Sequence, residues 1–253
     1  MIVENSVYFV DKKELFIKKL SFAMNQIRPG IDTIVQQYPL PCISIKPDGT
    51  PVTQLDLALS EYVEEVITRE FKDATFYSEE KFSTWAFPLL ALDPLDGTKE
   101  YIEGRAEWAV SVGLFLSEEF RGEGWVYNPV TKECFSTAEP IGFEEMETYH
   151  GEVSHTEWKS GLFTSELIKP FSVKPVGSIA YKLGRLAAGK SQFVVSKRPK
   201  NIWDIAGGTL LCQAAGFKFY SRGLEVTKVW RLYQPPLIWC HPELFPQLSR
   251  VFR

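Results

Sequence analysis

Apolar residues recur at helical spacing in several parts of the chain. In the clearest run, Leu55–Phe71, apolar side chains three and four residues apart are separated by glutamates, and Thr53 precedes the run as a candidate cap. A weaker amphipathic pattern covers residues 12–26 and is broken at Pro29–Gly30. Two later helices are predicted at 178–188 and 203–215.

Short apolar runs between these helices predict strands. Phe87–Leu92 is continuously apolar, so we expect it to be buried on both faces of a sheet. The runs Trp125–Tyr127 and Cys134–Ser136 flank the turn Asn128–Pro129 and predict a strand pair. Strands and helices interleave along the chain, so the predicted fold class is α+β, that is, mixed α/β. The remaining strands are expected at 75–77, 110–116, 192–196 and 217–221, with a loop at 39–49.

A polar segment rich in glutamate, 140–156, marks a soft boundary in the middle of the chain. It divides the chain into an N-terminal α+β half, 1–140, and a C-terminal α/β half, 141–253. No apolar run approaches the ~20 residues that cross a bilayer. The first residues also lack the basic start and long apolar stretch of a signal peptide. We therefore expect a cytoplasmic protein without a transmembrane segment.

Net charge and cysteine content exclude some classes of function. The formal net charge of −4 over 253 residues argues against binding a nucleic acid polymer, whose phosphates need a basic surface. An acidic protein that handles phosphate must supply positive charge locally, and bound metal ions are one way to do so. The four cysteines are far apart and form no paired motif, which favours buried apolar thiols over a zinc site or a disulfide framework.

The strongest chemical signal is the segment Leu92–Glu100, which reads Leu-Asp-Pro-Leu-Asp-Gly-Thr-Lys-Glu. Two carboxylates, Asp93 and Asp96, follow an apolar run, and Gly97 permits a sharp turn. A helix beginning near Thr98 would direct its first N–H groups toward an anion. Mg²⁺ prefers oxygen ligands, which these aspartates and the Leu95 carbonyl can provide. An acidic pair in a turn is also commonly just solvated.

Three further segments each place an acid at the end of an apolar element. Asp56 lies at the start of the predicted helix after Thr53, the pair Glu79–Glu80 follows a short strand, and Asp204 begins a second helix. Each acid has a simpler explanation. Asp56 and Asp204 could be first-turn acids favoured by the helix dipole, and Glu79–Glu80 could be a solvated pair.

Taken together, these segments resemble the inositol monophosphatase superfamily in their order and separations. The resemblance rests on Pro51–Asp56, Glu79–Glu80, Asp93–Thr98 and Trp203–Gly208, and it extends over 51–223. It implies a layered αβαβα sandwich and a phosphatase that directs water at a phosphorylated substrate without a phosphoenzyme. Sensitivity to lithium and a homodimer are also implied.

The resemblance implies roles for individual residues. Asp56, Glu79 and Thr98 would be catalytic, orienting and deprotonating the attacking water. Two or three Mg²⁺ ions would be bound, with Asp204 near the leaving oxygen. The implied metal ligands are Glu79, Asp93, the Leu95 carbonyl, Asp96 and Asp204. The implied phosphate and substrate contacts are Gly97, Thr98, Lys99, Gly177, Ser178 and Lys182.

Within the superfamily, the segment Gly97–Tyr101 is similar to the 3′(2′),5′-bisphosphate nucleotidase branch. The favoured substrate is therefore 3′-phosphoadenosine 5′-phosphate, and inositol monophosphate or a related sugar phosphate is the alternative. The basic stretch 196–200 departs from the order usual in that branch, and Lys182 could instead be a solvated helix lysine. A binding protein without catalytic activity is a further alternative, although it would not need the whole set of acids.

Two other motifs match only in part. Gly184–Ser191 fits the literal P-loop pattern, but a helix is predicted before it and a strand after it, which is the reverse of a P-loop. We interpret Gly189 as the stop of the preceding helix. The aspartates of aspartyl-phosphate phosphatases are two residues apart, whereas Asp93 and Asp96 are three apart, which argues against that mechanism.

Overall fold

The structure is a computed structural model that describes residues 3–47, 49–79, 84–138, 149–163, 168–169 and 171–252, with only the backbone for 3–18. The helices in these ranges are α1 (Val3–Gln37), α2 (Gln54–Glu70), α3 (Thr98–Ile102), α4 (His155–Lys159), α5 (Ile179–Ala187), α6 (Ile202–Ala214) and α7 (Phe245–Val251). The strands are β1 (Ile43–Ile45), β2 (Pro51–Thr53), β3 (Thr75–Ser78), β4 (Leu89–Asp96), β5 (Ala109–Phe115), β6 (Gly122–Tyr127), β7 (Cys134–Ser136), β8 (His150–Val153), β9 (Ser172–Pro175), β10 (Phe193–Ser196), β11 (Lys200–Asn201), β12 (Lys218–Ser221), β13 (Leu224–Glu225), β14 (Leu232–Tyr233) and β15 (Leu237–Cys240).

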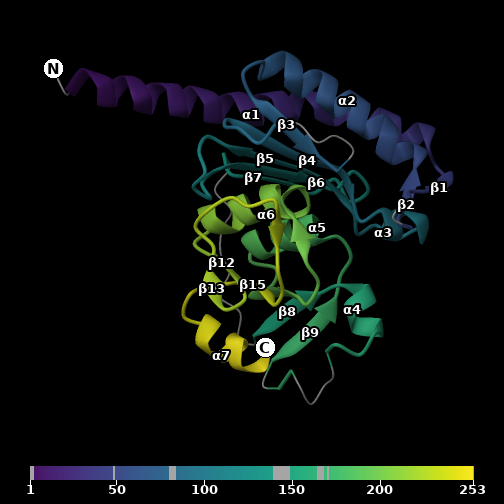
Figure 1. Ribbon diagram of the computed structural model, residues 1–253. Helices are drawn as coiled ribbons and strands as arrows, with labels where there is room; N and C mark the ends of the chain where they lie inside the picture. The colour runs from purple at the N-terminus through teal and green to yellow at the C-terminus, as the bar shows by residue number, and fades with distance from the viewer. Residues whose placement is uncertain are drawn as a thin grey trace.

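These elements stack in the αβαβα order predicted from the sequence (Figure 1). Helices α1 and α2 cover one face of a sheet with strand order β3-β4-β5-β6-β7. Helices α5 and α6 lie between that sheet and a second one, ordered β13-β12-β15-β10-β8-β9, and α7 covers the far side. Three apolar cores fill the spaces between the successive layers.

Strand β4 shows why the first sheet is central to the fold. Leu90 and Leu92 pack toward α1 and α2, whereas Leu89 and Ala91 pack toward α5 and α6. Successive side chains on a strand point to opposite faces, so a continuous apolar run serves two cores at once. The expected burial on both faces is confirmed, as is the expected antiparallel pairing of β6 with β7.

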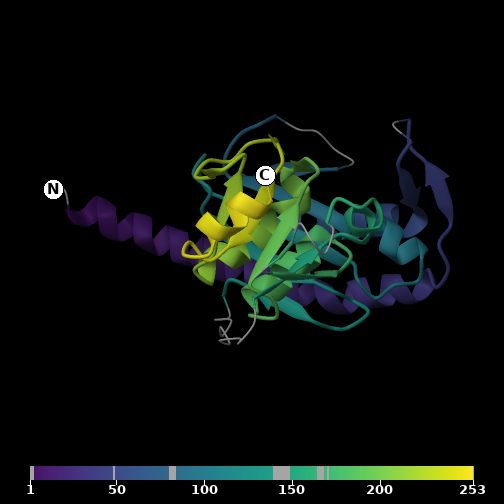
Figure 2. The same ribbon diagram turned by 90° about the horizontal axis from the view of Figure 1, so that it is seen from below.

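The prediction that a helix ends before Pro29–Gly30 was wrong. Helix α1 runs through both residues and its N-terminal end projects past the sheet in both views (Figures 1 and 2). Ile27 and Ile31 are buried on either side of the break signal, so packing compensates for the missing N–H of proline. Gly30 allows close contact with α2, because a Cβ there would lie 2.0 Å from the Tyr62 Oη.

Several strands were not predicted from the sequence, among them β1 and β8. The expected loop at 39–49 contains β1, which pairs with β2 as an antiparallel hairpin. Strand β8, in the segment expected to be a boundary, pairs in parallel with β9 and β10 and is held by tertiary pairing. Residues 139–148 lie outside the described residues, and so does the expected boundary between 140 and 141.

The interpretation of the P-loop-like segment is confirmed. Helix α5 precedes it and β10 follows it, so no strand leads into the glycine-rich turn. Gly189 has φ +71°, the left-handed conformation of a residue that stops a helix. Its N–H donates to the Leu186 carbonyl at 2.9 Å, and the N–H of Lys190 donates to the Arg185 carbonyl at 2.9 Å. These bonds close the last turn of α5.

The structure tests the expected burial of the cysteines and the expected absence of a transmembrane segment. Cys212 and Cys240 are buried as expected, whereas Cys42 is exposed and Cys134 is half-buried, so burial of all four thiols was wrong. Both of the latter residues lie in or next to edge strands, where one side of the chain faces solvent. Among the residues that the structure describes, no helix is both long and apolar enough to cross a membrane.

Candidate active site

The end of β4 places two aspartates side by side. Asp93 pairs across the sheet with Ser111 and Asp96 with Ala109, so the register shifts between them. A bulge of this kind bends a strand and redirects its side chains. Gly97 then takes φ +101° and forms the N-cap of α3, where the sequence predicted a sharp turn and a helix start.

Four acids from three segments act on one another's ionisation. Burial raises the pKa of Asp93 well above its usual range, and the negative charges of Asp96, Glu79 and Asp204 raise that pKa further. Burial also raises the pKa of Asp204 to about 7, an effect that the charge of Lys200 partly offsets. The carboxylates of these four sequence-predicted metal ligands therefore lie near enough to one another to interact electrostatically.

Asp56 joins this group through Thr98. It occupies the third position of α2 and forms a capping box with Thr53, whose N–H donates to Asp56 Oδ2 at 2.8 Å. The Thr98 hydroxyl donates to Asp56 Oδ1 at 2.9 Å and lies 3.3 Å from the Leu95 carbonyl oxygen. Burial raises the pKa of Asp56, while hydrogen bonds from Thr53 and Thr98 and the charge of Lys46 lower it. Asp56 therefore completes the capping box of α2 and also accepts from Thr98 at the candidate site.

The Gly177–Ser178 segment approaches the site from the other half. Ser178 Oγ and the Ala180 N–H both donate to Asp96 Oδ2, the latter at 2.6 Å. Ser178 has φ +49°, a conformation that costs energy in a residue with a side chain. Gly177 is required because a Cβ there would lie 2.1 Å from Glu100 Cγ. Ser178 therefore lies beside Asp96, and the expected contact of Gly177 and Ser178 with substrate stays a prediction.

Lys182 is neither solvated nor directed at an anion. Its side chain is 2% exposed, and Nζ donates to the carbonyl oxygens of Val176 and Ser178 at 2.9 Å and of Gly177 at 3.3 Å. These three bonds use all three ammonium hydrogens. Lys182 thus holds the 176–178 backbone in place, so both interpretations offered by the sequence need revision.

The remaining sequence-predicted contact, Lys99, lies at the edge of the site. Its Nζ is 3.4 Å from Thr156 Oγ1 in α4, and the pair is exposed. Lys99 follows Thr98 in α3 but extends toward the second half of the chain. The Lys99 ammonium forms no ion pair or hydrogen bond with any acidic residue that the structure describes.

Sequence reasoning missed other residues around the site. Lys46 forms an ion pair with Glu79, with 2.5 Å between Nζ and Oε1. Glu107 accepts from the Gly177 N–H at 2.7 Å and lies 2.6 Å from His155 Nε2. The sequence signal for Lys46 was only a turn, and nothing near Glu107 formed a pattern. Both contacts join segments far apart in the chain.

Three aspartates offer oxygen atoms of the kind that a divalent cation binds. A backbone N–H holds one oxygen each of Asp93, Asp96 and Asp204, with Leu95, Ala180 and Asn201 as the donors. The second oxygen of each makes no hydrogen bond to any described residue, which leaves it available as a ligand. Within the described part of the chain, no group of three or more histidine, cysteine, aspartate or glutamate side chains is placed so that it could hold a metal ion. The fit therefore rests on donor chemistry, which suits Mg²⁺.

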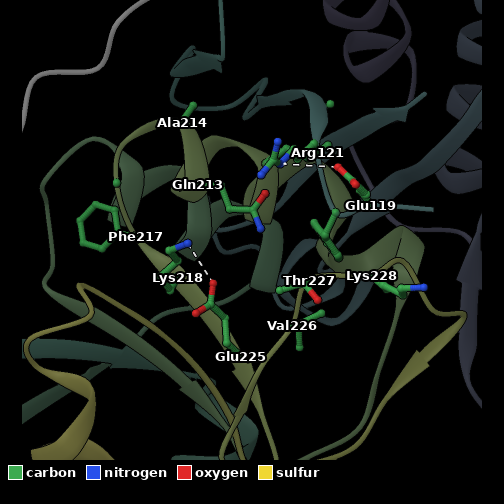
Figure 3. Close-up of a pocket in the computed structure, with 14 residues that line it drawn as sticks. Glu119, Arg121, Gln213, Ala214, Phe217, Lys218, Glu225, Val226, Thr227 and Lys228 are labelled. Carbon is green, nitrogen blue, oxygen red and sulfur yellow. Dashed lines mark ion pairs between the residues drawn. The ribbon is translucent and has the colours of Figure 1, made fainter. Parts of the chain in front are cut away.

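A separate cavity lies at the opposite end of α6 from Asp204 (Figure 3). It has a volume of about 550 Å³, and its lining includes the apolar residues Leu210 and Phe217. Lys218 and Glu225 on its wall pair with each other at 2.9 Å, so their charges are already matched. Helix α6 has 13 residues and spans about 20 Å at 1.5 Å per residue. This cavity is therefore distinct from the carboxylate site.

Comparison with known proteins shows which family this chain resembles in sequence and in fold. Residues 20–242 match the model of the inositol monophosphatase family. Inositol monophosphatase 3 of Solanum lycopersicum is 27% identical over 201 residues, 69% of this chain and 75% of that protein. The 3′(2′),5′-bisphosphate nucleotidase CysQ of Escherichia coli (strain K12) is 27% identical over 208 residues, 73% and 83% of the two chains. An IMPase of Thermotoga maritima has the same fold, with a TM-score of 0.79, 21% identity and coverage of 93% and 96%.

Proposed function

The chain belongs to the inositol monophosphatase family, and on that premise we propose that it hydrolyses 3′-phosphoadenosine 5′-phosphate to adenosine 5′-monophosphate and phosphate. Family members are phosphatases and are generally Mg²⁺-dependent. The observation that carries the proposal is the meeting of Asp93, Asp96, Asp204 and Glu79 next to the Asp56–Thr98 hydrogen bond. No single element of the fold supplies this set.

In this proposal the metal ligands are Glu79, Asp93, the Leu95 carbonyl, Asp96 and Asp204, and they would hold two or three Mg²⁺ ions. When bound, the ions supply charge neutralisation at the phosphoryl oxygens and lower the pKa of the attacking water. The free oxygens of the three aspartates support these assignments, since hard cations take carboxylate ligands.

Asp56 and Thr98 form a route for the proton of the attacking water. Thr98 donates its hydroxyl hydrogen to Asp56, so the lone pairs of its oxygen can accept one from water. As water attacks phosphorus, its proton passes to Thr98 Oγ1 while the Thr98 proton passes to Asp56 Oδ1. The raised pKa of Asp56 makes it a better base near neutral pH. Glu79 would orient the same water.

Substrate contacts come from the two strained or tight turns at the site. The N–H groups of Gly97 and Thr98 would bind the reacting phosphate, and Ser178 would lie beside it. Lys182 would act through the backbone that it holds, because its ammonium donates to three carbonyl oxygens there. Lys99 remains a proposed contact at the edge of the site. The division of the chain into 1–140 and 141–253 stays a proposal, as do the homodimer and sensitivity to lithium.

The alternative substrate is inositol monophosphate or a related sugar phosphate. It is favoured by the tomato relative, an inositol monophosphatase that is as similar in sequence as the nucleotidase relative. The nucleotide is favoured by the segment Gly97–Tyr101, which is similar to the nucleotidase branch. The presence of every expected acid argues against a protein that only binds its ligand.

The proposal predicts Mg²⁺-dependent phosphate release that requires Asp96. Phosphate release would be measured from 3′-phosphoadenosine 5′-phosphate and inositol 1-phosphate side by side, using wild-type, Asp96→Asn and Asp73→Asn proteins. We expect the nucleotide to be preferred and Asp96→Asn to lose at least about 100-fold in kcat/KM, because a metal ligand is weakened. Asp73 is exposed, so Asp73→Asn should match wild type. Activity that survives Asp96→Asn would refute the mechanism, and preference for the inositol ester would refute the substrate assignment.

A further inference from the structure

Three lysines act electrostatically on acids of the candidate site. The ammonium groups of two of them are already bound by other protein groups. Lys46 pairs with Glu79, and Lys182 donates to three backbone carbonyls. Lys200 differs, since its ammonium has no hydrogen bond or ion pair with any residue that the structure describes. Lys200 is also half-buried. A charged group that is partly removed from water without a partner is unfavourable unless a ligand supplies one.

The fold holds the backbone of Lys200 at the start of α6, the helix that carries Asp204. Lys200 begins β11 and lies opposite Tyr233 of β14, a buried residue that anchors this two-stranded ribbon. The next residue, Asn201, is the N-cap of α6, and its N–H donates to Asp204 Oδ2 at 2.9 Å. The positive charge of Lys200 lowers the pKa of both Asp204 and Lys182. The ammonium is therefore close enough to act electrostatically on residues in the first turns of both α5 and α6.

This position selects a particular part of the substrate. In the proposed mechanism Asp204 is the acid on the side of the leaving oxygen, so a cation beside it faces the group attached to that oxygen. A lysine binds phosphate as a compact point charge. A nucleoside bisphosphate carries a second phosphate on that leaving portion, whereas inositol 1-phosphate and a nucleoside 3′-monophosphate do not.

We propose that Lys200 is a specificity residue that binds the second phosphate, carried on the leaving portion of the substrate, and so selects nucleoside bisphosphates over monophosphates. This inference rests on the proposed phosphatase function. It adds a reason for substrate choice that lies outside the metal-binding acids. It also explains why the basic stretch 196–200 can differ in order from the nucleotidase branch, since one lysine in β11 suffices to meet the phosphate.

Steady-state kinetics on two matched substrates test the proposal. Adenosine 3′,5′-bisphosphate and adenosine 3′-monophosphate share the reacting phosphate and differ only in the second one. With Lys200→Gln we expect KM for the bisphosphate to rise about 10- to 100-fold, the scale of a lost hydrogen bond to a charged group, with kcat within about threefold. KM for the monophosphate should not change. Lys200→Arg should keep part of the preference, and Lys174→Gln, at an exposed residue of β9, should match wild type.

Binding of the product provides a readout without turnover. Adenosine 5′-monophosphate keeps the second phosphate, so its affinity, measured by calorimetry, should fall by about the same 10- to 100-fold in Lys200→Gln. An equal loss of kcat on both substrates would overturn the proposal, because Lys200 would then act on the leaving oxygen or on Asp204. An unchanged preference would overturn it as well. By contrast, a wild-type protein that releases no phosphate from any ester would contradict the proposed function itself.

Discussion

At the scale of single residues, the acids of the site are positioned by hydrogen bonds close to them in the chain. The Leu95 N–H holds Asp93, and the Asn201 N–H holds Asp204. Each of these bonds uses one oxygen of the carboxylate and leaves the other oxygen available as a metal ligand. The pKa values of Asp93 and Asp204 are raised because burial of a negative charge is unfavourable. A bound divalent cation would offset that unfavourable burial.

One prediction concerns the pH dependence of stability. Because burial raises the pKa of folded Asp204 to about 7, above its unfolded value of roughly 3.9, its contribution to stability is present at low pH and is lost as pH rises through 7. We therefore expect the Tm of the protein in EDTA to fall between pH 6 and pH 8.5. Added Mg²⁺ should raise the Tm more at pH 8.5 than at pH 6, since binding displaces the proton.

Asp204→Asn isolates this effect in the same thermal unfolding experiment. The slope of Tm against pH in EDTA should become smaller in this variant, and the gain from Mg²⁺ should shrink by several degrees. About 2–4 °C corresponds to 1 kcal/mol in a protein of this size. Part of the slope should remain, because the pKa of Asp93 is also raised. A Tm in EDTA that rises from pH 6 to pH 8.5 would contradict the assignment.

At the scale of elements, glycines set how closely α6 approaches the first sheet. A Cβ on Gly207 would lie 2.8 Å from the carbonyl oxygens of Trp125 and Val112. A Cβ on Gly124, in β6, would lie 2.2 Å from the Gly207 carbonyl oxygen. This close contact fixes the height of α6 above the sheet and with it the position of Asp204, one turn earlier in the same helix.

Gly207→Ala should destabilise the protein although alanine favours helix. Relief of the backbone clash requires α6 to move, and overpacking of this kind costs about 1–3 kcal/mol. Ala214→Gly, on the exposed side of α6, is the control for helix propensity and should cost at most about 1 kcal/mol. Urea denaturation would give both values. If helix propensity dominated, Gly207→Ala would be more stable than wild type, and the packing argument would be wrong.

At the scale of the whole molecule, the turn between β5 and β6 is joined directly to the C-terminal part of the chain. The Phe120 N–H donates to the Thr227 carbonyl at 2.8 Å, and the Val229 N–H donates to the Glu118 carbonyl at 2.8 Å. The Phe120 side chain is buried in the central core with Phe219. This junction therefore connects the first sheet with a segment that follows Asp204 in the chain.

Phe120→Ala should weaken the whole fold rather than one half of it. Deletion of a buried phenylalanine costs about 3–5 kcal/mol. The central core is shared by both sheets, so we expect a lower denaturation midpoint with a single transition. Phe22→Ala, where the side chain is 66% exposed, is the matched control and should change stability by no more than about 0.5 kcal/mol. Two separate transitions in Phe120→Ala would show instead that the halves fold independently.

Much of this architecture could be predicted from local patterns. Helix α2 has apolar residues at helical spacing and a capping threonine, so it was predicted within one residue of each observed end. Strand β4 was predicted from its continuous apolar run, but it continues past Leu92 to Asp96. Failures occurred where distant contacts decide. Helix α1 passes through Pro29 because Ile27 and Ile31 are buried on both sides of it, and β8 forms because β9 and β10 pair with it.

The sequence by itself determined which acids are present and that each ends an apolar element, because motif spacing and hydrophobic periodicity are local properties. Only the tertiary structure decided how their neighbours act. It buried Lys182 beneath the Gly177–Ser178 turn, paired Lys46 with Glu79 and left Lys200 without a partner beside Asp204. A lysine has the same sequence signature in all three situations. Its role depends on burial and on partners far away in the chain, which no local pattern encodes.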